Sequence, residues 1–332
     1  MSNPDVSIMV CSRNRAEALA EALKSLTALE TAGFDYEIVV VDNASTDHTA
    51  EVVASTAQRS TVPVRYVREP RAGIAFARNC GVKTSRGEWI AFFDDDQWAD
   101  PRWLVELLAM AKAKNVRGVG GAVLLRLPAG NNRELAPFCR TLLGETVGLN
   151  APRRYSSTVT PGTCNLMLHR SVFEEVGLFN EMLNTRGEDT ELFIRVHARG
   201  IETWYTPAAV VFHLIPPERL TDSYLEKLTR LTVIGMAKND RYYWGRLAFP
   251  FVWTARLAQM LILLIPRWAW AHLRRNRELA FGTRCRLALA YGYLRNGLRL
   301  ILGGDDRPSE SVPIWRMKPR RITSISKSGE RL

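Results

Sequence analysis

Three adjacent carboxylates, Asp94, Asp95 and Asp96, follow the apolar run 88–93. Such a short aromatic run after a turn signal predicts a buried strand of a parallel sheet, whose carboxyl end is where ligands bind. Neighbouring carboxylates repel one another unless a cation or hydrogen-bond donors neutralise them. Mg²⁺ or Mn²⁺, which commonly bridge carboxylates to substrate phosphates, would provide that charge. The alternative is a solvated acidic turn before the helix that Pro101 opens.

Alternating strands and helices are expected to position these carboxylates. Short apolar or β-branched runs predict strands, and helical spacing of apolar residues predicts the segments between them. This alternation indicates an α/β fold with a mostly parallel, doubly wound sheet and right-handed crossovers. Asp42, at the end of the second strand, is then expected at the same edge as Asp94. The expected strands are 6–10, 37–42, 64–67 and 88–93, with helices at 16–26, 47–58 and 73–84.

Two common nucleotide-binding motifs are absent from the sequence. No Gly-x-Gly-x-x-Gly follows the first strand, and no Gly-x-x-x-x-Gly-Lys-Ser/Thr occurs anywhere, which argues against dinucleotide and P-loop sites. A nucleotide could still bind with Asp42 accepting hydrogen bonds from the base or ribose, Arg71 and Arg78 near its phosphates, and a metal at Asp96. Each residue alone also has a plain structural explanation, as a helix cap or a surface arginine.

Four segments, in one order along the chain, resemble the donor half of the family 2 glycosyltransferases. That resemblance implies a GT-A fold, which binds a nucleotide sugar with a divalent cation on an Asp-x-Asp motif and transfers the sugar with inversion. It implies that Asp94 faces the ribose or sugar, that Asp96 holds the metal and that Asp42 contacts the base, with Asp95 also on the donor side. The segments are 42–47, 73–81, 87–96 and 101–104.

The first strand departs from the family pattern. The family usually continues with Pro-Thr-Tyr-Asn-Arg, whereas this chain has Cys-Ser-Arg-Asn-Arg at 11–15. The expected ring contact with the base becomes a guanidinium contact from Arg13, beside Ser12, so both residues are expected to bind the donor. The identity of the base is left open.

The second half of the chain is expected to bind the acceptor and to supply the base. Residues 127–157 predict a loop-rich segment that could frame an acceptor. The segment 187–192, Gly-Glu-Asp-Thr-Glu-Leu, is similar to a family block that begins a helix beneath the sugar, which implies that Asp189 is the catalytic base; otherwise it is an ordinary first-turn acid. His213 ends a strand at 207–213. A lone histidine is more often structural, but some family members complete the metal site at this place.

Charge and cysteine content indicate which partners and which cellular compartment to expect. The 332-residue chain has a net charge of +11, and residues 267–332 hold 15 Lys and Arg against 5 Asp and Glu. Such a basic block attracts an anionic membrane surface or nucleic acid, and no recognised motif supports nucleic acid. The five cysteines are widely spaced, which suggests neither a disulfide framework nor a zinc site. The N-terminus shows no export signal, and both features fit a protein of the reducing cytosol.

Three regions are expected along the chain: a GT-A domain at 1–220, a basic helical region at 221–302 and a loose tail at 303–332. Residues 244–265 are the most apolar stretch, but Pro250, Arg256, Gln259 and Pro266 interrupt it, so we expect an interfacial rather than a spanning segment. Trp268 and nearby arginines suit a headgroup region. The alternative is a helical hairpin packed on the core with its Leu and Trp residues buried.

These features together predict a metal-dependent inverting glycosyltransferase, peripheral on the cytoplasmic face of the cell membrane, with a glycan or lipid-linked acceptor. The sequence contains neither Gln-x-x-Arg-Trp nor a bundle of transmembrane segments, which mark the processive synthases of the family. One sugar per encounter is therefore expected. The alternative is a non-catalytic, membrane-bound protein that binds nucleotide sugars or glycans.

Overall fold

The computed structural model describes residues 3–156, 159–183, 187–233 and 236–303. The expected tail lies outside these ranges beyond Gly303. The α/β part consists, in chain order, of β1 (Val6–Ser12), α1 (Ala16–Leu26), β2 (Tyr36–Asn43), α2 (Thr49–Arg59), β3 (Val64–Glu69), α3 (Ile74–Thr84), β4 (Trp89–Asp94), β5 (Gln97–Ala99), α4 (Trp103–Lys114), β6 (Gly118–Arg126), α5 (Pro137–Leu142), β7 (Arg153–Arg154), β8 (Asn165–His169), α6 (Arg170–Val176), α7 (Glu188–Ala198), β9 (Trp204–Leu214) and the 3₁₀ turn η1 (Pro217–Leu220). The C-terminal helices are α8 (Asp222–Thr232), α9 (Met236–Gln259), the π-helical turn η2 (Met260–Leu264), α10 (Ile265–Leu273) and α11 (Arg277–Ile301).

One mixed sheet organises the α/β part. Within the described ranges it has nine strands in the order β3-β2-β1-β4-β8-β6-β9-β5, with β7 paired to β9. The strands β3, β2, β1 and β4 pair in parallel, as the sequence predicts, whereas β8 runs antiparallel to β4 and β6. Ser12 pairs in register with Asp42, and Cys11 pairs with Asp94. The predicted placement of Asp42 and Asp94 at one edge is therefore confirmed.

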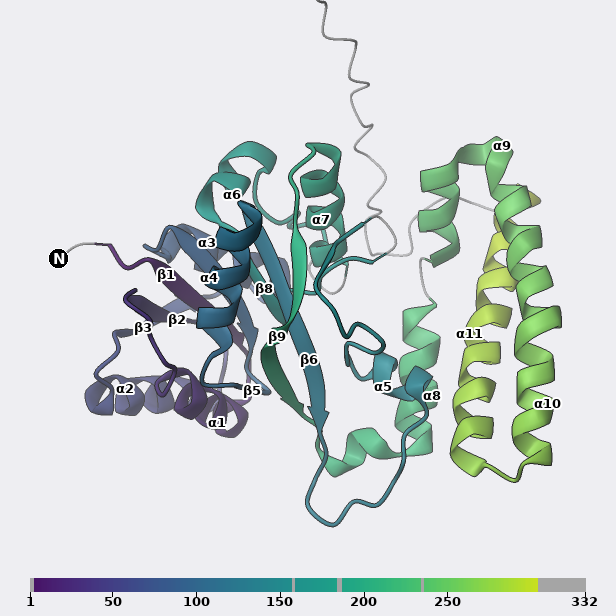
Figure 1. Ribbon diagram of the computed structural model, residues 1–332, viewed down its shortest axis with the longest axis horizontal. Helices are drawn as coiled ribbons and strands as arrows, with labels where there is room; N and C mark the ends of the chain where they lie inside the picture. Colours follow the sequence, from purple (N-terminus) through teal and green to yellow (C-terminus); the bar gives the residue numbers. More distant parts are fainter. Residues whose placement is uncertain (1–2, 157–158, 184–186, 234–235, 304–332) are drawn as a thin grey trace, which may run out of the picture.

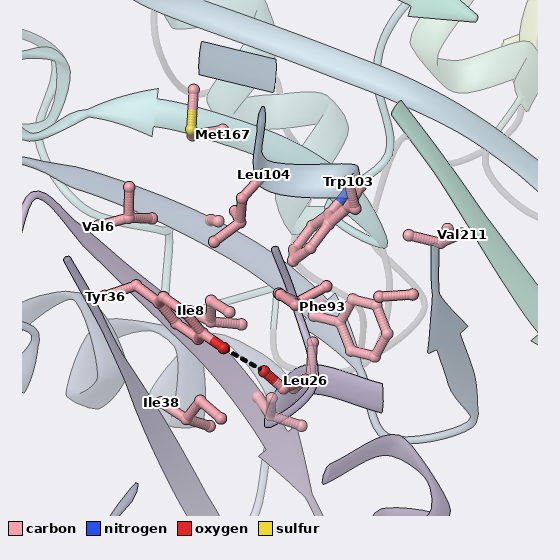
Figure 2. Close-up of a cluster of buried hydrophobic side chains, with 14 of the residues drawn as sticks. Val6, Ile8, Leu26, Tyr36, Ile38, Phe93, Trp103, Leu104, Met167 and Val211 are labelled. Carbon is pink, nitrogen blue, oxygen red and sulfur yellow. Dashed lines mark hydrogen bonds between the residues drawn. The ribbon is translucent and has the colours of Figure 1, made fainter. Parts of the chain in front are cut away.

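Helices cover both faces of the sheet (Figure 1). Alternate residues of β1 point to opposite faces: Ile8 packs in a cluster with α1, α2 and α4, and Met9 packs in a cluster with α3, α6 and α7. Figure 2 shows the first cluster, in which the Tyr36 hydroxyl donates to the Leu26 carbonyl at 2.8 Å. Burial of apolar side chains on both faces fixes the sheet on which the polar strand ends are presented.

The C-terminal helices attach to the α/β part through α8 and α11. Phe281 and Cys285 of α11 share a hydrophobic cluster with Cys139 of α5 and Leu225 of α8. On its other side α11 packs along α9 and α10, and α10 with the later part of α9 lies farthest from the sheet (Figure 1). The region is therefore a packed helical unit rather than a set of separate segments.

The apolar stretch in this unit differs from its expected form. A non-helical Gly245 (φ 77°) precedes a helix that runs through Pro250 and Pro266 to Leu273. Pro250 lies close after this kink, where few helical hydrogen bonds are lost, and the wider π turn η2 immediately precedes Pro266. The prediction that the prolines break the stretch is therefore wrong.

The apolar side chains of this helix are also not buried. Leu247 and Leu273 are 91% and 86% exposed, so the alternative of a hairpin packed on the core is right for α11 but wrong in burying these leucines. Among the described residues, one helical segment, Trp244–Leu273, is long and apolar enough to cross a membrane by length and composition. Only 11% of its most apolar window is buried.

Candidate active site

Three aspartates lie where β4 ends, and each has different partners. Ser12, the last residue of β1, donates its hydroxyl to Asp95 Oδ2 at 2.7 Å. Arg15 contacts both Asp95, at 2.9 Å, and Asp96, at 3.1 Å. The acidic turn is therefore neutralised from within the protein, rather than being the solvated turn of the alternative interpretation.

Burial and charge give the three carboxyls different proton affinities. Burial raises the pKa of Asp94 to about 6, against the charge of Arg78, and the neighbouring carboxylates add to the rise. Burial also raises the pKa of Asp95, although Arg15 and Ser12 oppose it. Asp96 behaves oppositely: burial disfavours its charge, but His213 and two arginines outweigh burial and hold its pKa well below the ordinary value. Asp96 is the anionic centre of the group.

His213, near the end of β9, faces Asp96 across the pairing of β5 with β9. Its Nδ1 donates to the Leu143 carbonyl at 2.9 Å, and its Nε2 lies 3.3 Å from Asp96 Oδ2, where the protonated ring donates to the carboxylate. Arg219 Nη1 lies 3.1 Å from the same carboxylate oxygen and 3.3 Å from Nε2. Burial alone would lower the pKa of His213, but its hydrogen bond to Asp96 raises it.

The pair of Asp96 and His213 fits a divalent cation. Two ligands on one edge of an octahedron with bonds of ~2.1 Å lie about 3 Å apart, close to the 3.3 Å observed. The Leu143 carbonyl fixes the ring as outer partners of metal-bound histidines do. In the described ranges no group of three or more His, Cys, Asp or Glu side chains could hold an ion. A cation here would therefore also use phosphate oxygens and water.

Asp42 borders the site at the end of β2. It accepts hydrogen bonds from the Tyr66 hydroxyl at 2.6 Å and from the Ser45 amide at 2.8 Å. Burial opposes its charge, yet these hydrogen bonds lower the pKa of Asp42. Arg13 is exposed beside it, directly after β1. Both residues border the edge at which a nucleotide base is expected.

The two arginines expected near the phosphates have protein partners. Arg71 forms a bidentate pair with Glu69 at 2.9 Å and lies over the Phe76 ring. Arg78 is buried and pairs with Glu188, the first residue of α7. Burial would lower the pKa of Arg78, but Glu188, Asp94 and other acidic neighbours raise it. Arg78 thus lies between the β4 carboxylates and α7.

The segment that leads to α7 is held against α3. Asn79 accepts from the Phe179 amide at 2.8 Å and donates to the Phe179 carbonyl at 2.9 Å. Gly187, with a left-handed φ of 88° that favours glycine, precedes the helix. Asp189 therefore lies in the first turn, where among the described residues only Thr190 donates to it, to Oδ1. Its Oδ2 is left for another donor.

A cavity of about 640 Å³ opens beside Asp96, between the start of α1 and the loops that follow β6 and β9. Arg15, Arg126 and Arg219 line it, and Leu127 begins the loop segment expected to frame an acceptor. The carboxylates of Glu17, Asp96 and Glu218 also line the cavity. Its guanidinium groups could bind an anionic ligand such as a diphosphate.

The structure thus brings together most of the residues expected from the sequence. The acidic turn, Ser12 and His213 form one cluster, Asp42 borders it, and Arg78 links it to the helix of Asp189. Arg71 lies to the side, engaged with Glu69. Sequence reasoning missed a further set: Arg15, Tyr66, Glu188 and Arg219. Arg15 follows β1, Tyr66 lies within β3, Glu188 begins α7 and Arg219 follows a Pro-Pro turn. Arg15 and Glu188 lie in segments that the sequence singled out, but their roles there depend on partners that are distant in sequence.

Comparison with known proteins agrees with this geometry. The model of the family "Glycosyl transferase family 2" matches residues 7–177, just over half of the chain. The chain is 30% identical over 226 residues to the "Succinoglycan biosynthesis protein ExoM" of Rhizobium meliloti, covering 67% of this chain and 71% of that protein. It is also 30% identical to the protein ExoO of the same organism, covering 64% of this chain and 61% of that one.

Solved structures share the fold at low sequence identity. A mannosyltransferase from Pyrobaculum calidifontis in complex with GDP-Man and Mn²⁺ aligns with a TM-score of 0.60 and 18% identity, over 90% of this chain and 88% of that one. GalNAc-T7 with UDP, GalNAc and Mn²⁺ aligns with a TM-score of 0.54 and 17% identity, over 72% and 51%. These likenesses show a GT-A fold. The chain belongs to glycosyl transferase family 2 and is a glycosyltransferase, not a non-catalytic sugar-binding protein.

Proposed function

We propose that this glycosyltransferase is metal-dependent and inverting, and that it transfers a sugar from a nucleotide-sugar donor to a glycan or lipid-linked acceptor in cell-surface polysaccharide synthesis. The observation that carries the proposal is the pairing of Asp96 with Nε2 of His213 at 3.3 Å, beside a cavity lined by arginines. The printed names of the succinoglycan proteins support the acceptor class.

The donor side is assigned from the strand ends. Asp42 stays ionised and offers its remaining acceptor capacity to the base or ribose, with Ser12 and Arg13 beside it. Burial disfavours the ionised form of Asp94, and hydroxyl donors of the ribose or sugar would stabilise that form. Arg15 and Arg219, which already contact the carboxylates, can turn toward the diphosphate. Arg71 and Arg78 are paired with protein carboxylates and do not contact the diphosphate directly. Arg78 contributes by holding α7 in place.

Asp96 and His213 are the residues that would hold Mg²⁺ or Mn²⁺. When bound, the cation would act as a Lewis acid that neutralises the leaving diphosphate. While no cation is bound, Arg219 lies next to Asp96 and balances its negative charge. The Leu143 carbonyl keeps a proton on Nδ1, so that Nε2 is the nitrogen that would give up its proton and bind the cation.

Asp189 is the proposed general base. In an inverting transfer the acceptor oxygen bonds to the anomeric carbon while the carbon–oxygen bond to the diphosphate breaks and its electron pair stays on the diphosphate. Asp189 Oδ2 takes the acceptor proton on the face opposite the nucleotide. Arg78 and Asn79 fix the helix that carries it.

The proposal places the enzyme at the inner face of the cell membrane, as a peripheral protein, with residues 1–220 as the catalytic domain and 221–302 as the membrane-associated region. Support comes from the exposed apolar helix of α9 and α10 and from the basic end of the chain. A lipid-linked acceptor would then be presented in the same plane as the enzyme.

A nucleotide-sugar screen tests the proposal. Purified enzyme is incubated with a panel of nucleotide sugars and Mn²⁺, and release of nucleoside diphosphate is measured alongside thermal stabilisation. One donor is expected to stabilise the protein and to be slowly hydrolysed, and EDTA should abolish both effects. If no nucleotide sugar binds, or if binding is equal in EDTA, the proposal is wrong.

A further inference from the structure

One face of the C-terminal helices is apolar and uncovered. Leu247, Phe251, Ile262 and Leu273 are 91%, 76%, 69% and 86% exposed. The first two are four residues apart, and the later ones follow at intervals of eleven, close to three helical turns, so all four lie on one side of the α9–α10 helix. We name this side the apolar stripe. Because the four side chains are largely exposed, neither α11 nor the α/β part covers the apolar stripe.

The charge around the apolar stripe has one sign. Between Asp240 and Glu278 the chain has no Asp or Glu. The same interval contains seven arginines: Arg241, Arg246, Arg256, Arg267, Arg274, Arg275 and Arg277. Trp268 and Trp270 are partly exposed among them. Apolar side chains bordered by tryptophan and arginine match the layers of an anionic bilayer, from hydrocarbon to headgroup.

The turn between α10 and α11 forms a basic hollow at the end of the stripe. This hollow, of about 480 Å³, is lined by His272, Arg275, Arg277 and Arg284, with Asp222 at its edge. The acids nearby are already paired: Asp222 with Arg133 at 2.8 Å, and Glu226 with Arg284 at 2.7 Å. Among the described residues no acid pairs with Arg275 or Arg277. The hollow thus has two uncompensated cations directly beside the exposed Leu273.

The packing of α11 decides how the helix lies in a membrane. Residues 246–273 would extend ~42 Å at 1.5 Å per residue, enough to cross a hydrocarbon core of ~30 Å. However, α11 packs along the same helix, with Trp253 Nε1 donating to the Leu294 carbonyl at 2.8 Å, and it also packs on α5 and α8. A crossing helix would carry the exposed Arg286, Arg295 and Arg299 into the hydrocarbon, which is strongly unfavourable.

We propose that the α9–α10 helix lies in the plane of an anionic bilayer, with the apolar stripe immersed and the basic hollow binding lipid phosphates. The stripe then holds the enzyme by burial of side chains that no described part of the chain covers, and the hollow makes the attachment selective for anionic lipid. The inference deepens the proposed function and takes its biological role from it, because an enzyme held flat against the membrane meets a lipid-linked acceptor by diffusion in two dimensions.

Vesicle flotation of the full chain without nucleotide sugar tests the stripe and the hollow. The parent should float with vesicles containing anionic phospholipid. Leu247→Asn, Phe251→Asn and Leu273→Asn combined should weaken binding by at least ~100-fold, since a buried side chain of this size contributes about tenfold or more. Arg275→Gln with Arg277→Gln should weaken binding roughly twentyfold on anionic vesicles, and not on neutral ones. All substituted residues are exposed, so folding should be retained.

Matched controls remove the same chemistry elsewhere. Ile194→Asn takes an exposed apolar side chain from α7, and Arg59→Gln with Lys112→Gln takes two charges from α2 and α4. Neither control should change flotation. If the parent stays unbound on anionic vesicles at low salt, or if the triple variant floats like the parent, the stripe is not a membrane surface. Dimers of the parent that the triple variant dissociates would instead assign the stripe to a second copy.

Topology is tested in cells with an impermeant thiol reagent, using Arg246→Cys and Arg274→Cys singly. Both positions lie at the ends of the helix, and an in-plane helix on the inner face leaves both unlabelled in intact spheroplasts and labelled after lysis. Labelling of either one in intact spheroplasts would show that the helix crosses, and would overturn the in-plane placement. Donor hydrolysis measured without lipid reports on the proposed function separately, so failure of one is distinguishable from failure of the other.

Discussion

Removal of the Arg78 guanidinium should destabilise the protein strongly. The side chains of Arg78 and Glu188 are only 10% and 6% exposed, and Glu188 Oε2 has no hydrogen-bond partner among the described atoms. Arg78→Met would leave the Glu188 carboxylate buried without its cation, and breaking such a pair costs ~3–5 kcal/mol. For a chain of this size the corresponding fall in Tm is about 6 °C or more.

The loss should depend on pH in a defined direction. Burial raises the pKa of Glu188, and the charge of Arg78 opposes that rise. Without Arg78 the folded-state pKa of Glu188 rises further above its unfolded value, so the folded protein takes up a proton there as the pH falls. The destabilisation should therefore be full at pH 8, above that pKa, and smaller at pH 5.

A double-mutant cycle isolates the pair. Thermal unfolding is measured for Arg78→Met, Glu188→Gln and the double variant, with Arg102→Met as a control, because the exposed pair of Arg102 with Glu106 should contribute less than ~1 kcal/mol. The double variant should recover most of the stability, since the Glu188 carboxylate is no longer buried without its cation. Equal stability of Arg78→Met and Arg102→Met, or a loss that is the same at pH 5 and pH 8, would refute the reasoning.

The same variants separate a positioning role of Arg78 from donor binding. If Arg78 only holds α7, the double variant regains both stability and donor affinity. If Arg78 contacts the donor, the double variant regains stability while the KM for the donor stays high. The kcat should follow the stability in the first case, because Asp189 is carried on the helix that Glu188 begins.

Three further predictions concern the general base Asp189, Arg219 at the proposed cation site, and the structural carboxylate of Glu37. Asp189→Asn should lower the transfer rate by about 10² or more at saturating donor with donor affinity unchanged; a lost affinity with a normal rate would make it a binding residue. Arg219→Met removes the cation that competes at Asp96, so about fivefold less Mn²⁺ should suffice for half-maximal thermal stabilisation without nucleotide; weaker Mn²⁺ binding would contradict this. Burial opposes the charge of Glu37, but hydrogen bonds from Arg65 and Ser7 hold its pKa below the ordinary value. Glu37→Gln should therefore cost ~1–3 kcal/mol at pH 7, less as the pH falls through that pKa, and equal losses at pH 4 and pH 7 would disprove this assignment.

The parallel half of the sheet and its polar edge were predictable because both depend on local pattern. Apolar runs that end on acids define β2 and β4, and parallel pairing places their ends together whatever the loops do. That pattern alone is enough to place Asp42 and Asp94 at one edge. The mixed half was not predictable in this way, because nothing local specifies that β8 runs antiparallel between β4 and β6.

The remaining partners in the site depend on contacts between distant segments. Arg15 and Arg219 are separated by about two hundred residues yet meet at one carboxylate. The apolar helix was misjudged for a related reason: Pro250 and Pro266 suggest breaks in the helix, whereas a kink at Gly245 and a π turn accommodate both. Whether its Leu and Trp residues pack or stay exposed depends on where α11 lies.

Binding of Mn²⁺ followed by electron paramagnetic resonance tests the central claim most directly. Free Mn²⁺ gives a strong signal that is lost on binding, so titrations with and without nucleoside diphosphates report the site itself, independent of the acceptor. The account predicts one tight Mn²⁺ per chain in the presence of the matching diphosphate, greatly weakened in Asp96→Asn and in His213→Ala, both of which should stay folded. Tight binding that is unchanged in Asp96→Asn, or sugar transfer at full rate in excess EDTA, would contradict it.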